Sequence, residues 1–230
     1  MTTIPCPTAV ALLSGGLDST VLLHHARQSL VSGRVLTLSY NYGQRHTREL
    51  DCARWQAERV GAVEHRVIDL SFLGELLRGG SALIAGGHDV PNLTDLAPEQ
   101  LTQPPTYVPN RNMMLLSMAA AYAEASGVRD VFYGAQAMDQ YGYWDCTVEF
   151  VERINRVLSL NRNDPITIHA PFVTMKKTEV VKLGLSLGVD FSHTWSCYRG
   201  ESKACGTCPT CVERLTAFRE AGIPDPVPYA

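Results

Sequence analysis

The 230-residue sequence lacks any apolar run long enough to cross a membrane, which argues against helical membrane spans. It also lacks an excess of basic residues, because 20 Lys and Arg stand against 23 Asp and Glu, for a formal net charge of −3. We therefore expect no stable nucleic acid binding. The first five residues have neither the charged nor the apolar region of a signal peptide, so we expect a cytoplasmic protein without a membrane partner.

Disulfides are a poor explanation for the cysteines. There are seven of them, an odd number, and four lie close together near the C-terminus. A secreted disulfide framework would use an even set spread along a short chain. The cysteine pattern therefore also favours a cytoplasmic protein.

Short apolar runs alternate with helical patterns along most of the chain. The predicted strands cover residues 9–13, 35–40, 64–69, 130–134 and 166–169, and the predicted helices cover 19–28, 47–60, 113–126, 148–160 and 177–187. This alternation predicts an α/β fold with a doubly wound, mostly parallel sheet. We expect residues 1–190 to form the α/β domain and residues 191–230 a small C-terminal segment packed on it.

Residues 79–106 interrupt the alternation. They are rich in glycine and proline and have few periodic apolar positions. Because a loop of this length is often functional, we expect a flexible lid near the site.

A glycine-containing loop, Ser-Gly-Gly-Leu-Asp-Ser, directly follows the first predicted strand and opens the first predicted helix. Backbone N–H groups and the positive end of a helix then point at one place, which makes an anion site. The glycines allow close approach of the backbone to a ligand. The predicted nucleotide-binding residues are Ser14, Gly15, Gly16, Leu17, Asp18, Ser19 and Thr20.

This loop has no lysine, so it is not a Walker A loop. Asp18 would repel phosphates unless a divalent cation lay between them, which points to ATP with Mg²⁺. The string resembles the pyrophosphate loop of the N-type ATP pyrophosphatases, which cleave ATP between its α and β phosphates. That resemblance implies an adenine nucleotide alpha hydrolase-like, Rossmann-like fold. The simpler alternative is a strand–turn–helix junction with a serine cap.

The C-terminal cysteines have the spacing of a metal site. Four thiolates at this spacing suit a closed, tetrahedral, structural Zn²⁺ site, one per chain. An iron–sulfur cluster and a zinc module that binds nucleic acid are the alternatives. The predicted ligands are Cys197, Cys205, Cys208 and Cys211.

The loop and the cysteine cluster together resemble the 7-cyano-7-deazaguanine synthase (QueC) family. The resemblance extends through residues 42–46, 108–112, 142–146 and 177–179, and so covers nearly the whole chain. It implies an ATP-dependent ligase that converts 7-carboxy-7-deazaguanine and ammonia to the nitrile preQ0, a queuosine precursor. It also implies a homodimer. Activation of the carboxylate by adenylation would supply the leaving group that ammonia displaces.

The resemblance also implies roles for individual residues. The catalytic residues would be Asp18, Lys177 and Arg111, with Lys177 pairing the leaving pyrophosphate. The substrate-binding residues would be Tyr42, Gln44, Arg111, Asp139, Tyr143 and Asp145, with one of the two aspartates pairing with the deazaguanine edge. Lys177 could instead be a solvated lysine at a helix start, Arg111 a surface arginine, and either aspartate a helix cap.

Two positions depart from the family pattern. Asn110 stands where the family usually has glycine, although asparagine tolerates a left-handed backbone. Trp144 stands where the family usually has proline, which puts the substrate in question more than the ATP chemistry. Two other functions stay open: a tRNA sulfur transferase of the same superfamily, and a nucleotide-binding zinc protein without catalytic activity.

Overall fold

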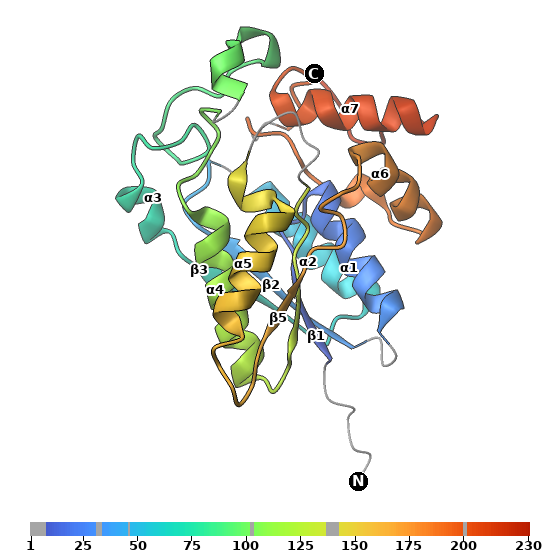
Figure 1. Cartoon of the computed structure of the whole chain (residues 1–230). Coiled ribbons are helices and arrows are strands. Elements are labelled where there is room, and N and C mark those ends of the chain that lie inside the picture. The colour runs from blue at the N-terminus through green and yellow to red at the C-terminus, as the bar shows by residue number, and fades with distance from the viewer. Residues whose placement is uncertain (1–7, 31–33, 46, 102–103, 137–142, 200–201) are drawn as a thin grey trace.

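Five parallel strands form the central sheet (Figure 1). The computed structural model describes residues 8–30, 34–45, 47–101, 104–136, 143–199 and 202–230. The strands are β1 (Ala9–Leu12), β2 (Val35–Asn41), β3 (Glu64–Asp69), β4 (Asp130–Phe132) and β5 (Thr167–His169), in the order β3-β2-β1-β4-β5. This arrangement confirms the predicted α/β fold with a parallel sheet.

Helices cover both faces of this sheet because its strands are apolar on both sides. The five long helices that alternate with the strands are α1 (Leu17–Ser29), α2 (Arg48–Val60), α4 (Arg111–Ala125), α5 (Val148–Leu158) and α6 (Lys177–Ser186). Val10 and Leu12 of β1 pack on the side of α4 and α5, while Ala11 and Leu13 pack on the side of α1 and α2.

Two of these helices begin earlier than the sequence predicts. Helix α1 begins at Leu17, so Asp18 lies in its first turn. Helix α4 begins at Arg111, because Asn110 adopts the left-handed conformation with φ 52° and turns the chain directly into the helix. The expectation that Asn110 tolerates this conformation is therefore confirmed.

The C-terminal segment contains a helix that the sequence analysis did not predict. Helix α7 (Pro209–Ala221) begins with proline at its first turn, where a missing N–H costs nothing. Its Ala217 and Phe218 pack against Val180 and Val181 of α6. The segment thus lies on the α/β unit at the upper end of Figure 1, while the division at residue 190 stays a prediction.

Short helical turns fill the remaining connections. Helix α3 (Phe72–Leu76) follows β3, and single 3-10 turns lie at Leu93–Asp95, Pro98–Leu101, Trp144–Cys146 and Phe191–His193. None of these was predicted, because one turn carries too little periodicity to stand out in a sequence.

The segment after α3 is tied to its surroundings by arginines. Arg45 donates to the carbonyls of Ala82 at 2.7 Å and Gly87 at 2.8 Å. Arg199 of the C-terminal segment donates to Asn92 Oδ1 at 2.6 Å. The described part of residues 79–106 therefore contacts the cysteine-bearing segment through Asn92, and the role of residues 79–106 as a flexible lid stays a prediction.

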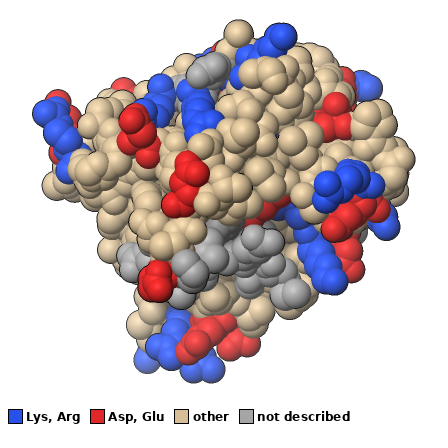
Figure 2. All heavy atoms as spheres, turned by 90° about the horizontal axis from the view of Figure 1, so that it is seen from above, with Lys and Arg blue, Asp and Glu red and all other residues tan. Residues whose placement is uncertain are grey.

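Charge is mixed on the face shown in Figure 2. Lys and Arg lie among Asp and Glu, both at its edges and within it, with broad uncharged areas between them. Within the described ranges, no helix is both long and apolar enough to span a membrane.

Candidate active site

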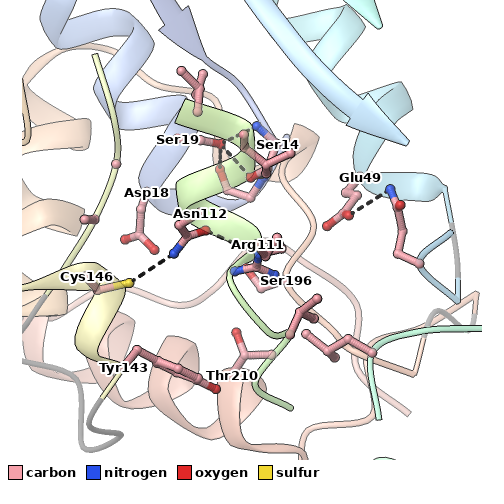
Figure 3. A pocket seen from close by; sticks show the side chains of 18 of the residues that line it. Ser14, Asp18, Ser19, Glu49, Arg111, Asn112, Tyr143, Cys146, Ser196 and Thr210 are labelled. Atoms are coloured by element: carbon pink, nitrogen blue, oxygen red, sulfur yellow. Dashed lines mark hydrogen bonds between the residues drawn. The ribbon is translucent and has the colours of Figure 1, made fainter. Parts of the chain in front are cut away.

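A cavity of ≈ 300 Å³ lies at the carboxyl ends of the strands. Ligands of open α/β sheets bind at this edge, because the loops that follow neighbouring strands meet there. Its walls come from the loop after β1, the turn after β2, the start of α4, the segment after β4 and the C-terminal segment (Figure 3).

The predicted phosphate loop forms one wall through two serines. Ser14 Oγ and Ser19 Oγ lie 3.0 Å apart, and Ser19 Oγ also accepts the Ser14 N–H at 3.1 Å. Ser14, Gly16, Leu17, Asp18 and Ser19 line the cavity, at the N-terminus of α1. Gly15 and Thr20 do not line it, and the Thr20 side chain is fully buried beneath the loop.

Gly15 is required by the close approach of another element. It has φ +85°, and a Cβ built there would lie 1.8 Å from the main-chain oxygen of Glu49. The start of α2 therefore packs directly against the loop. The Gly15 carbonyl accepts the Trp195 N–H at 2.9 Å, which ties the loop to the C-terminal segment as well.

Asp18 and Lys177, 159 residues apart in sequence, form an ion pair in the cavity. Lys177 Nζ donates to Asp18 Oδ2 at 2.8 Å, and the two side chains are 19% and 26% exposed. Lys177 is the first residue of α6, where a cation is unfavourable beside the helix dipole. The interpretation of Lys177 as a solvated surface lysine is therefore wrong.

The other Asp18 oxygen, Oδ1, is buried and has no hydrogen-bond partner. A buried carboxylate oxygen without a donor is costly, which indicates a missing partner such as a cation. Oxygen is also the ligand that Mg²⁺ prefers.

Arg111 enters the cavity from the first turn of α4. Its Nη1 donates to the Tyr42 hydroxyl at 3.4 Å and its Nε to Asn112 Oδ1 at 3.3 Å. Burial raises the pKa of Tyr42, so its hydroxyl stays protonated beside the guanidinium. Arg111 is thus positioned inside the site rather than on the surface.

Gln44 and Glu49 form the wall after β2. The Gln44 amide accepts the Tyr42 N–H at 2.8 Å and donates to the Tyr40 carbonyl at 3.3 Å and to Glu49 Oε1 at 3.5 Å. Gln44 therefore fixes this turn, and its contact with substrate stays a prediction. Burial raises the pKa of Glu49 to about 7, while Arg111 and Gln44 act in the opposite direction.

Tyr143 and Asp145 line the cavity from the segment before α5. The Tyr143 hydroxyl lies 2.8 Å from Thr106 Oγ1. Asp145 is 3% exposed, and burial raises the pKa of its carboxyl, with Arg111 opposing that shift. Thr147, not Asp145, caps α5 by accepting the Phe150 N–H, so the cap interpretation of Asp145 is wrong. Asp139 lies outside the described residues.

Trp144 points away from the cavity. The residue is 45% exposed; its ring packs edge-on against Phe150 at 5.4 Å, and its Nε1 donates to the Tyr107 hydroxyl at 2.9 Å. It is absent from the cavity lining formed by the described residues. Trp144 therefore adds no side chain to the described cavity walls, and its ring contacts them through Tyr107, which lines the cavity.

Several lining residues were missed by the sequence analysis. Tyr133 follows β4, so the rule of strand carboxyl ends could have found it. Glu49 was missed because acidic residues are common in the first turn of a helix, where they interact favourably with the helix dipole, so its position gives no sign of a functional role. Tyr198, Thr210 and Glu213 come from the C-terminal segment, whose position against the loop has no local signal in the sequence.

The four C-terminal cysteines come together as predicted. The sulfurs of Cys197, Cys205, Cys208 and Cys211 all lie within 4.8 Å of one another. The main-chain N–H of Cys205 donates to Cys197 Sγ at 3.4 Å, and that of Cys208 donates to Cys205 Sγ at 3.3 Å. Such N–H···S bonds stabilise thiolates, so the cluster could hold a metal ion.

Comparison with known proteins places these features in a family. The chain matches the family described as "Queuosine biosynthesis protein QueC" over residues 8–222. Proteins named 7-cyano-7-deazaguanine synthase from Marinobacter nauticus and Caldicellulosiruptor saccharolyticus are each 44% identical to it. These matches cover 96% of this chain and 97% and 95% of the relatives.

A solved structure also shares the fold. The NMN synthetase of Francisella tularensis matches with a TM-score of 0.51 at 16% identity, covering 95% of this chain and 79% of that one. This match concerns the fold alone. The family match, in contrast, spans most of the sequence and confirms the resemblance that the motifs indicated. This chain therefore belongs to the QueC family of queuosine biosynthesis proteins.

Proposed function

We propose that this protein catalyses the ATP-dependent conversion of 7-carboxy-7-deazaguanine and ammonia to 7-cyano-7-deazaguanine. The single observation that carries the proposal is the cavity that joins the Ser14–Ser19 loop, the Asp18–Lys177 pair and Arg111. The relatives with this name share 44% of their residues with the chain over almost its full length. Adenylation first activates the carboxylate, and a second activation removes the amide oxygen to leave the nitrile.

The loop is suited to hold the phosphates of ATP. The start of α1 directs its free N–H groups and two serine hydroxyls into the cavity. Lys177 then supplies a fixed positive charge for the pyrophosphate that leaves. Preorganised charge of this kind stabilises a transition state without reorganisation during the reaction.

Asp18 is the residue that would hold Mg²⁺. Its buried, partnerless Oδ1 fits an oxygen ligand of such a cation. When bound, Mg²⁺ would neutralise phosphate charge beside the carboxylate. Asp18 also orients Lys177 through the 2.8 Å hydrogen bond.

Arg111 is the residue that would bind the substrate carboxylate. A guanidinium recognises a carboxylate by two parallel hydrogen bonds, which orients the oxygen to be adenylated. Tyr42 and Tyr143 provide aromatic surface for a planar base in the same cavity. Asp145 would pair with the N–H and amino groups of the deazaguanine, and Asp139 remains the other candidate for that role.

The cysteine cluster would hold one structural Zn²⁺ per chain. Four thiolates leave no open position for water, which fits a structural site. The cluster packs in a core with Trp195, which itself lines the cavity. Zinc would therefore hold the C-terminal wall of the site in place.

We further propose a cytoplasmic homodimer in which residues 1–190 form the α/β domain and residues 191–230 a C-terminal segment packed on it. The mixed surface charge supports the absence of stable nucleic acid binding (Figure 2). Sulfur transfer to tRNA would need a second reactive cysteine, and Cys146 is the only cysteine among the described residues that line the cavity.

Mass spectrometry tests the function. Purified protein is incubated with 7-carboxy-7-deazaguanine, ATP, Mg²⁺ and ammonium, beside the Asp18→Ala variant. We expect ATP-dependent nitrile, lost in the variant. AMP without nitrile would redirect the search to other acid substrates, and no turnover by folded, zinc-loaded protein would favour the non-catalytic alternative.

A further inference from the structure

Glu49 is a carboxylate in the cavity for which the proposed function has no role. It lies in the first turn of α2, on a different wall from Asp18. Figure 3 shows its carboxylate directed into the cavity, on the far side of Arg111 from Asp18. It is therefore separated from the phosphate loop side chains but faces the same enclosed space.

The position of Glu49 is fixed from two directions. Its main-chain oxygen abuts Gly15, where a Cβ would lie 1.8 Å away. Its side-chain Oε1 accepts from Gln44 Nε2 at 3.5 Å, and Gln44 is itself held by Tyr40 and Tyr42. A carboxylate that is placed inside a cavity by its backbone and by Gln44 can act on a defined atom of a bound substrate.

The surroundings of Glu49 favour a proton acceptor over a permanent anion. Its charged or titratable neighbours are Arg111 from α4, Tyr42 after β2 and Cys52 on its own helix. Burial outweighs the attraction of Arg111, so the pKa of Glu49 rises to about 7. A base works best when its pKa lies close to the operating pH.

The proposed reaction contains a step that needs such a base. Ammonia attacks the activated carboxyl carbon, a C–N bond forms, and the C–O bond to AMP breaks with its electron pair leaving on AMP. The nitrogen must lose one proton to become a neutral amide. We propose that Glu49 is the catalytic residue that accepts this proton on a carboxylate oxygen, an inference that rests on the proposed function.

The substitution Glu49→Gln tests this role. Glutamine keeps the shape and one acceptor oxygen for Gln44, but it cannot accept a proton at neutral pH. We expect pyrophosphate release in the absence of ammonium to stay within about threefold of wild type, and ammonia-dependent amide formation to fall by about 10²-fold. Glu58→Gln, on the exposed side of the same helix, is the matched control and should change neither rate.

The pH profile separates proton transfer from a structural role. With the free ammonia concentration held constant, the wild-type rate of amide formation should rise up to about pH 7, the pKa of Glu49, and then level off. Glu49→Gln should lose this rise of the rate with pH, and Glu49→Asp should restore the rise at a lower overall rate.

Three results would overturn the inference. If wild-type protein makes no nitrile, the proposed function fails and this inference with it. If wild type is active and Glu49→Gln keeps both the rate of ammonia-dependent amide formation and its rise with pH, only the inference about Glu49 fails. If Glu49→Gln loses pyrophosphate release as strongly as amide formation, Glu49 belongs to activation rather than to proton transfer.

Discussion

The ion pair of Arg214 and Asp225 should be the most sensitive point of the C-terminal segment. The two side chains are 3% and 2% exposed, and Arg214 donates from Nε at 2.7 Å and from Nη2 at 2.9 Å to the two carboxylate oxygens. Its Nη1 also donates to Thr194 Oγ1 at 2.8 Å. Asp225 in turn accepts the Tyr229 hydroxyl at 2.6 Å. Asp225→Ala would leave a buried guanidinium with no counter-charge.

Loss of one partner of a buried pair costs about 3–5 kcal/mol of unfolding free energy. For a chain of this length, 1 kcal/mol shifts the Tm by about 2–4 °C, so we expect Asp225→Ala to lower the Tm by roughly 6–20 °C. The double variant Arg214→Met with Asp225→Ala removes the stranded charge as well. It should therefore be more stable than Asp225→Ala alone, by about 1–3 kcal/mol.

Urea unfolding followed by far-UV circular dichroism measures these free energies, and the two single variants with the double variant complete a double-mutant cycle. If Asp225→Ala costs less than about 1 kcal/mol, the pair contributes no more than a surface salt bridge. If the costs of the two single substitutions simply add in the double variant, the argument from a stranded buried charge is refuted.

Three further predictions concern the site. Cys208→Ser should lower bound zinc from one equivalent to none, as measured by elemental analysis after dialysis, and a zinc content equal to wild type would contradict the cluster. Lys177→Met should reduce pyrophosphate release by about 10²–10³-fold with an unchanged circular dichroism spectrum, whereas near-normal release would remove Lys177 from the phosphate site. The folded-state pKa of Glu49, about 7, lies above the ordinary 4.5, so this group stabilises the fold below pH 4.5 and that contribution is lost as pH rises through 7. Glu49→Gln should therefore be more stable than wild type at pH 8, by up to about 3 kcal/mol, and the difference should shrink as the pH falls and vanish only below the unfolded pKa, by about pH 4; equal stabilities at pH 8 would contradict the raised pKa.

The fold was predictable because its signals are local and repeated. β3 begins and ends where the apolar pattern predicts, and the other strands and long helices differ by a few residues at their ends. Helix starts were less predictable, because the left-handed Asn110 that opens α4 depends on one backbone angle. Helix α7 begins directly after Cys208 and contains Cys211, so the ligand spacing and the helical pattern overlap in one stretch of sequence.

The site was only partly predictable, for a physical reason. Residues such as Asp18 and Lys177 can be identified from the sequence motifs in which they stand, and the structure brings them together. Glu49 takes its chemistry from burial and from Arg111, which lies 62 positions away in the sequence. The orientation of Trp144, which turns outward onto Phe150, likewise depends on packing that no single position encodes.

The hydrogen bond from the Trp195 N–H to the Gly15 carbonyl would couple metal binding at the cysteines to nucleotide binding at the loop. Trp195 lies two residues before Cys197, so a short backbone segment connects the cysteine cluster to the Ser14–Ser19 loop. Coupling between two binding equilibria is reciprocal: a metal that raises nucleotide affinity by some factor has its own affinity raised by the same factor. On the proposed function, ATP bound at the loop would therefore protect a metal held by the four cysteines against a chelator, and removal of ATP would expose that metal to loss.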